Sequence, residues 1–123
     1  MDTSAGRLAL GSLGPLHWLA IALAVVTGVV HLVLGVDFLP HPMGAAFLIA
    51  AVGFFGGVAL VLVGYRRRLL YLLGVPFTAG QVVLWYLLNR PAGVADLSGA
   101  EAVDKVAQLL LIAALTVLYA RDR

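Results

Sequence analysis

The sequence lacks cysteine and has few charged residues among its 123 positions. The absence of cysteine excludes disulfide bonds, thiol catalysis and cysteine-ligated metals. Charged residues make up 11% of the chain and hydrophobic residues 63%, whereas soluble domains have about 25% and about 45–50%. This balance, with a mean hydropathy of +1.05, excludes a soluble globular domain and a disordered tail.

Net charge gives no support for a nucleic-acid partner. Eight basic and six acidic residues leave a formal charge of only +2, although the isoelectric point is about 9.4. The basic residues are not spread along a face that could follow a row of phosphates. We therefore expect no nucleic acid among the partners.

The few charges divide the chain into four long apolar runs. About 20 apolar helical residues cross the roughly 30 Å core of a bilayer. The sequence therefore predicts an all-α polytopic membrane protein, an antiparallel four-helix transmembrane bundle that forms one domain over residues 1–123. The expected helices cover residues 15–36, 44–65, 69–89 and 99–120.

Local signals fix the expected ends of these helices. Pro15 suits the first position of a helix, and the segment Pro40-His41-Pro42 prevents the first helix from continuing into the second. Ser98 and Glu101 have the spacing of a capping box. Pro76 lies inside the third run and predicts a kink there.

Basic residues are distributed unequally between the two sides of such a bundle. An even number of spans places both termini and the 66–68 turn together, on the side that holds six basic residues, while Arg90 and Lys105 lie on the other. The positive-inside rule then predicts cytoplasmic termini in a cell membrane. The six residues are Arg7, Arg66, Arg67, Arg68, Arg121 and Arg123. The triplet Arg66, Arg67 and Arg68 is expected to serve this topology first, and it could also meet anionic lipid head groups.

Polar side chains inside the spans are the first candidates for a functional site. Helical spacing puts Thr78, Gln81 and Trp85 on one face of the third helix, and Asp104 and Gln108 on one face of the fourth. At about 1.5 Å per residue, these groups fall in the outer half of the membrane. If the faces converge, they form a polar cluster of His31, Thr78, Gln81, Trp85, Asp104 and Gln108.

Two interpretations of this polar cluster remain open. A functional one predicts a water-accessible pocket for a small ligand or proton, lined by His31, Gln81 and Gln108, with Asp104 at its mouth. A structural one holds that these groups only join helices, at about 0.6 kcal/mol for each hydrogen bond.

Histidine spacing raises the question of a metal or haem. His17 and His31 lie 14 residues apart on one helix, as haem ligands do in membrane cytochromes b, but the other spans contain no histidine. Only paired first helices of a homodimer could complete such a site. Asp37 and His41 are too few for a structural zinc site. We expect no cofactor and no bound metal.

Small residues recur four positions apart on the first two predicted helices. They allow helix backbones to approach closely, either within one chain or between two chains. These residues are Ala20, Ala24 and Gly28 on the first helix, and Gly53 and Gly57 on the second.

Four segments together resemble a family of short, uncharacterised four-span membrane proteins of halophilic archaea. They are GVVHLVLGV at 28–36, GYRRRLLYLLG at 64–74, GQVVLWYLLNRP at 80–91 and VDKVAQLLLIAALTVLY at 103–119. The resemblance implies the four-span architecture and a cell-membrane location, but no activity. An excess of acidic residues on the outer side would suit a high-salt exterior.

No set of residues suggests catalysis, so we expect a non-enzymatic accessory or interaction protein of the lipid bilayer. Its partner would be a second copy or another membrane protein. The alternative is a small oligomeric transporter or channel that uses the polar cluster. A third hypothesis, an enzyme acting on lipid, would depend on Asp104 beside Lys105.

Overall fold

The computed structural model describes residues 10–89, 93 and 98–121 of the chain. A short 3-10 turn, η1 (Leu10–Ser12), precedes four α-helices: α1 (Pro15–Phe38), α2 (Pro42–Leu62), α3 (Arg67–Asn89) and α4 (Gly99–Arg121). All four helices are long and apolar enough to cross a membrane, and the described part of the chain contains no strand. The predicted fold class is confirmed.

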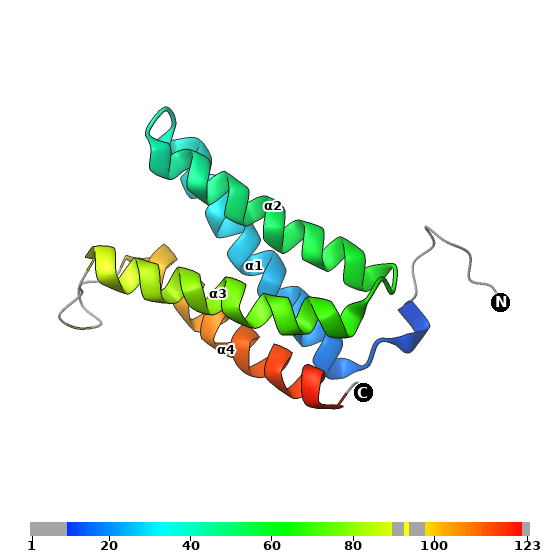
Figure 1. Cartoon of the computed structure of the whole chain (residues 1–123). Helices are drawn as coiled ribbons and strands as arrows, with labels where there is room; N and C mark the ends of the chain where they lie inside the picture. The colour runs from blue at the N-terminus through cyan, green and yellow to red at the C-terminus, as the bar shows by residue number, and fades with distance from the viewer. Residues whose placement is uncertain (1–9, 90–92, 94–97, 122–123) are drawn as a thin grey trace.

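Two helical hairpins form the molecule, α1 with α2 and α3 with α4 (Figure 1). Helix α1 packs against α2 and α4, and α3 packs against α4, whereas α2 and α3 contact each other much less. The two hairpins diverge away from the turn that joins α2 to α3 (Figure 1). The turn η1 and the last residues of α4 lie at the same end as that turn. The bundle is therefore joined mainly through α1 and α4.

Proline residues mark the start of α1 and the loop between α1 and α2. Pro15 occupies the start of α1, and His17 Nδ1 accepts a hydrogen bond from the N–H of Gly14, 3.0 Å away. Helix α1 continues to Phe38, beyond the expected end at 36, and stops because Leu39, before Pro40, is extended. Pro42 begins α2, with His41 capping it through a 3.0 Å bond from the N–H of Met43.

Helix α2 ends earlier than the expected residue 65 because Gly64 adopts a left-handed conformation, with a φ of 78°. The N–H groups of Gly64 and Tyr65 bond to the carbonyls of Val61 and Leu60, at 3.0 and 2.9 Å. These two bonds form a Schellman motif, which satisfies carbonyls at the end of a helix. The chain then enters α3 through Arg66, whose φ is also positive at 44°.

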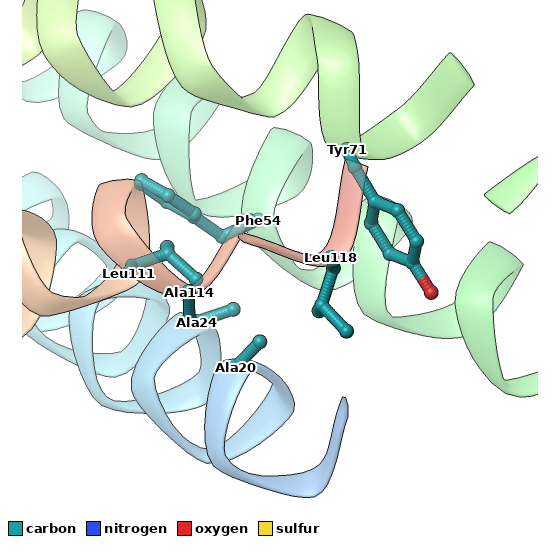
Figure 2. Packing of buried hydrophobic residues seen from close by; sticks show 7 residues of the cluster. All are labelled: Ala20, Ala24, Phe54, Tyr71, Leu111, Ala114 and Leu118. Atoms are coloured by element: carbon teal, nitrogen blue, oxygen red, sulfur yellow. The ribbon is translucent and has the colours of Figure 1, made fainter. Parts of the chain in front are cut away.

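The apolar core brings small residues of α1 against α4. Figure 2 shows Ala20 and Ala24 directed toward Ala114 and Leu118. Phe54 of α2, Tyr71 of α3 and Leu111 of α4 complete the buried cluster.

Candidate functional site

Helix α4 presents two adjacent charged residues to the interior. Asp104 and Lys105 are only 4% and 9% exposed. Lys105 Nζ lies 2.9 Å from Asp104 Oδ2, so the two charges form an ion pair. The sequence predicted Asp104 at the mouth of a water-accessible pocket. Both residues are instead buried among the helices, where each charge is compensated by the other.

Asp104 connects α4 to α1. The hydroxyl of Thr27 donates a hydrogen bond to Asp104 Oδ1, and His31 Nδ1 lies 3.7 Å from the same oxygen. His31 Nδ1 is also 2.8 Å from the carbonyl oxygen of Thr27. Because a carbonyl only accepts hydrogen bonds, this nitrogen carries the hydrogen. The ring of His31 is thereby fixed on the face of α1 that meets α4.

Helix α2 closes the other side of His31 with aromatic rings. The centroids of Phe47 and Phe54 lie 5.6 and 5.7 Å from the centroid of the imidazole. His31 itself is 5% exposed. Its position between a carboxylate and two phenyl rings limits its contact with surrounding solvent or lipid.

Lys105 and its neighbours connect α4 to α3. Lys105 Nζ donates to Gln108 Oε1 at 2.8 Å, and Gln108 Nε2 donates to Gln81 Oε1 at 3.1 Å. Gln81 in turn donates to the carbonyl of Phe77 at 3.1 Å. Lys105 Nζ also lies 5.2 Å from the centroid of the Trp85 ring, within the range of a cation–π contact.

The start of α4 extends the same set of interactions. Trp85 Nε1 donates to Glu101 Oε2 at 3.0 Å. The other oxygen of Glu101 accepts from the N–H of Ser98 at 2.9 Å, and the N–H of Glu101 bonds to the Ser98 hydroxyl at 3.1 Å. The capping box expected from the sequence is therefore present, and it also positions a carboxylate against α3. We call the connected residues the polar network: Thr27, His31, Gln81, Trp85, Glu101, Asp104, Lys105 and Gln108.

Most of the predicted polar cluster belongs to this network, but Thr78 does not. Its side chain is 1% exposed and lines a separate cavity. Three network members were missing from the prediction: Thr27, Glu101 and Lys105. Thr27 could have been found because it precedes His31 by one helical turn, and Lys105 because it precedes Gln108 by three residues. No local signal indicated that Glu101 would also bond to Trp85.

The polar network can hold helices together without an external ligand. It includes one buried ion pair whose charges cancel, and its amide side chains are bonded to each other. The bond between Gln81 and Gln108 means that α3 and α4 are not separated at this level. Asp104, Lys105 and Gln108 therefore each have a partner for a charged or amide group inside the chain.

A cavity of about 230 Å³ lies beside the core, nearer to the α2–α3 turn than the polar network is. Its lining includes Thr78 and Gly57 but not His31, Gln81 or Gln108. This location differs from the pocket expected from the sequence. The network residues are used in helix contacts, and the space opens instead among mainly apolar residues of all four helices.

Close helix approaches involve some of the predicted small residues. Gly28 faces the ring of Phe55, and a Cβ on Gly53 would come within 2.5 Å of Phe77 Cζ. A Cβ on Gly57 would have no neighbour within 4 Å, so this glycine leaves space rather than closing it. The tightest backbone approach joins Gly35 and Gly44, where a Cβ on Gly44 would lie 2.8 Å from the carbonyl oxygen of Gly35.

The arginine triplet also makes structural contacts. Arg67 Nε donates to the carbonyl of Val61 at 2.8 Å and its guanidinium bonds to the Ser12 hydroxyl. The guanidinium of Arg68 stacks 3.9 Å from the centroid of the Tyr119 ring. Arg66 is exposed. Arg7, Arg90 and Arg123, which entered the topology prediction, lie outside the described residues.

No group of three or more His, Cys, Asp or Glu side chains in the described segments is placed to hold a metal ion. His17 is instead used in capping α1 and His41 in capping α2. His17 also lies beside Tyr71, with 6.2 Å between the ring centroids.

Comparison with known proteins identifies a family without identifying an activity. The model of a family of unknown function, DUF7475, matches residues 4–119, so the chain belongs to that family. No curated protein and no solved structure matches the chain.

Proposed function

We propose that this member of the DUF7475 family is a non-enzymatic accessory protein that acts by binding another membrane protein or a second copy of itself. The observation that supports this function most is the uncovered surface of α2 and α3. Within the apolar segment that could cross the membrane, only 11% of α2 and 11% of α3 is buried inside the chain, against 28% for α1 and 33% for α4. These two helices therefore have the largest surface available to a partner.

Glycines on these surfaces favour a protein partner over lipid alone. Gly56 of α2 and Gly80 of α3 are exposed, and a Cβ on either would contact nothing within the chain. Glycine weakens a helix by about 1 kcal/mol relative to alanine, so its presence here is not explained by packing within one chain. In membranes, glycine lets a second helix approach closely.

The closed polar network supports the same function. A transporter needs a hydrated path, whereas the bonds of Asp104, Lys105 and Gln108 connect α4 to its neighbours. An accessory protein needs only a stable body that presents its outer helices.

Affinity capture from membranes in a mild detergent, followed by mass spectrometry, tests this function. The native protein should retain a defined partner or form a homo-oligomer. Gly56→Leu and Gly80→Leu should each reduce that association, because a bulky side chain prevents close helix contact. Val106→Leu, at an exposed position of α4 and therefore outside the proposed surface of α2 and α3, is the control and should retain the association.

Recovery of the monomer alone, under conditions that preserve other membrane complexes, would overturn the proposal. Equal loss of association in the glycine variants and in the Val106 control would contradict an interface formed by α2 and α3.

The buried ion pair favours a second candidate function, a small oligomeric transporter. Ionisable residues within spans are uncommon and often mark ion or proton pathways. Protein reconstituted into vesicles would dissipate an imposed pH gradient if this function applied, and Asp104→Asn would abolish the flux. Vesicles that hold the gradient as well as protein-free controls would exclude proton transport.

We also infer that both termini face the cytoplasm across a cell membrane, and that the protein is archaeal. The Arg66–Arg68 turn and Arg121 at one end of the bundle support the orientation. The resemblance to proteins of halophilic archaea supports the source.

A further inference from the structure

The cavity of about 230 Å³ extends over one half of the length of the bundle. On α3 its lining begins at Leu70 and reaches Phe77, next to the middle residue of that helix. The linings on α2 and α4 reach Gly53 and Leu111, which also lie beside the middle of their helices. At about 1.5 Å per residue, Leu70 and Phe77 are roughly 11 Å apart along the axis, and one leaflet contributes about 15 Å of hydrocarbon. The cavity therefore lies within a single leaflet.

The walls of the cavity suit a hydrocarbon chain. They come mainly from apolar side chains, including Ala20 of α1, Phe54 of α2 and Leu111 of α4. An apolar cavity of about 150 Å³ stays dry and accepts benzene, which has six carbon atoms. By the same ratio, the space here holds about nine carbon atoms. It is therefore large enough for a substantial part of one lipid chain.

The cavity opens toward the lipid between α2 and α3. Gly53, Leu73 and Phe77 belong to its lining and are also exposed on the outside of the bundle. Gly57 lines it as well, and a Cβ on Gly57 would have no neighbour within 4 Å. Helices α2 and α3 contact each other much less than the other packed pairs do. The chain of a neighbouring lipid can therefore enter the cavity from the side.

Positive charge lies at the end of the bundle to which the cavity is nearer. Arg66, Arg67 and Arg68 form the passage from α2 into α3, and Arg121 ends α4 at the same end (Figure 1). In the segments that the structure describes, the acidic residues all lie in the opposite half of the bundle. Arginine stays charged at any physiological pH. This end of the bundle therefore favours an anionic partner.

Arg67 connects this charge to the cavity. Its Nε donates to the carbonyl of Val61 at 2.8 Å, and Val61 lines the cavity from α2. Leu70, three residues after Arg67, lines it from α3. The guanidinium of Arg66 is exposed and bonds to no residue of the described segments. A guanidinium can bind a phosphate through two parallel N–H groups, so a phosphate at this turn would lie close to the apolar cavity.

We infer that the cavity is a binding site for an anionic phospholipid, with one hydrocarbon chain in the cavity and the phosphate at the Arg66–Arg68 turn. Depth and charge require the same orientation of the lipid, because the apolar space occupies one leaflet and the arginines lie at the surface of that leaflet. Basic groups beside membrane-spanning helices attract anionic head groups. The site does not depend on the proposed partner function, because it lies inside one chain.

Native mass spectrometry of the purified protein, released from detergent micelles, counts the lipids bound to each chain. The probe is dioleoylphosphatidylglycerol. The reference is dioleoylphosphatidylcholine, which has the same chains and no net charge. We expect one phosphatidylglycerol for each chain, retained in preference to phosphatidylcholine. Glycerol 3-phosphate, which presents the charge without a chain, should not bind.

A pair of charge variants tests the head-group position. Arg66→Gln should lower the affinity for phosphatidylglycerol about fivefold, as expected for one arginine near an anionic head group, and should leave the affinity for phosphatidylcholine unchanged. Ser98→Asp changes the net charge by the same amount at the opposite end of the bundle. Aspartate also caps helices, so this control should fold and keep the native affinity for phosphatidylglycerol.

A matched glycine pair tests the chain position. Gly57 lines the cavity and Gly56 does not, while both have room for a side chain. Gly57→Leu should abolish the retention of phosphatidylglycerol by the monomer, and Gly56→Leu should leave it unchanged. Circular dichroism and gel filtration establish that each variant folds.

Photolabelling gives a second measurement that needs no variant. A phosphatidylglycerol with a diazirine in the middle of one chain should label the cavity segments of the native protein, residues 53–61 and 70–77. If Gly57→Leu does not fold, this labelling pattern decides the chain position.

Several results would overturn the inference. Equal retention of the two lipids, or binding of glycerol 3-phosphate as tight as that of the lipid, would contradict a site that needs both charge and chain. Equal effects of Arg66→Gln and Ser98→Asp would remove the head group from the turn. Equal effects of the two glycine variants, or labelling spread over the outer surfaces of all four helices, would remove the chain from the cavity.

Discussion

Replacing Asp104 by asparagine should destabilise the protein more than replacing Asp104 and Lys105 together. Asparagine has nearly the shape of aspartate and can still accept the hydrogen bond of Thr27. It cannot compensate the charge of Lys105, whose Nζ lies 2.9 Å from the present carboxylate. The remaining ammonium would be buried, with Gln108 as its acceptor at 2.8 Å.

The magnitude follows from the cost of breaking a buried ion pair. Removing one partner of such a pair typically costs about 3–5 kcal/mol, because the other charge is left uncompensated. The double variant Asp104→Asn, Lys105→Met removes both charges. Its main cost is the unpaired oxygen of Gln108, about 1–2 kcal/mol. We therefore expect the double variant to be more stable than the single variant by about 1–4 kcal/mol, the difference between these two costs.

Equilibrium unfolding in mixed micelles with increasing sodium dodecyl sulfate measures these free energies. Trp85, beside Lys105, reports on the polar network, and far-ultraviolet circular dichroism reports on the helices. Asp37→Asn is the control, because Asp37 is exposed on the same protein and such a surface change usually alters stability by at most about 0.5 kcal/mol.

Two results would refute this reasoning. A cost below about 1 kcal/mol for Asp104→Asn would mean that Lys105 extends to water once released, as long side chains do. A double variant as unstable as the single variant would mean that the loss comes from packing rather than from an uncompensated charge.

Two further predictions concern the helix contacts and the topology. Gly44→Ala should cost about 1–3 kcal/mol in the same unfolding assay, because its Cβ would lie 2.8 Å from the carbonyl oxygen of Gly35. The control is Gly80→Ala, whose Cβ would contact no atom of the chain, and this variant should be neutral or more stable. Equal effects of the two substitutions would contradict the close approach of Gly35 and Gly44. Because the chain has no cysteine, Gly11→Cys and Gly93→Cys each provide a single labelling site for a thiol reagent that does not cross membranes. In intact cells we expect labelling of Gly93→Cys and no labelling of Gly11→Cys. Labelling of Gly11→Cys alone would contradict cytoplasmic termini.

Local sequence signals were sufficient to predict that there are four helices and roughly where they lie, but not where each one ends. Each span requires a long apolar run, since a helix satisfies its own backbone hydrogen bonds within lipid. Pro15 and the Ser98–Glu101 capping box indicated where two helices begin, and both act as expected. The end of α2 was misplaced because the Schellman motif at Gly64 and Tyr65 stops the helix before the apolar run reaches the arginines.

The site was only partly predictable from the same signals. Helical spacing placed Gln81 with Trp85 and Asp104 with Gln108, and the fold does join these residues in one network. Spacing also grouped Thr78 with Gln81 because both lie on α3. It could not show that Thr78 faces a cavity while Gln81 faces α4.

The sequence by itself determined that this chain forms four membrane-spanning helices, because hydropathy, proline positions and helix caps act over a few neighbouring residues. Only the tertiary structure decided which helices adjoin, that Thr27 meets Asp104 across 77 positions, and that Lys105 turns inward. Lipid is as apolar as the helix surfaces, so the burial of apolar area does not select one arrangement of spans. The choice depends on the fit of small residues and on pairs of polar groups far apart in the chain.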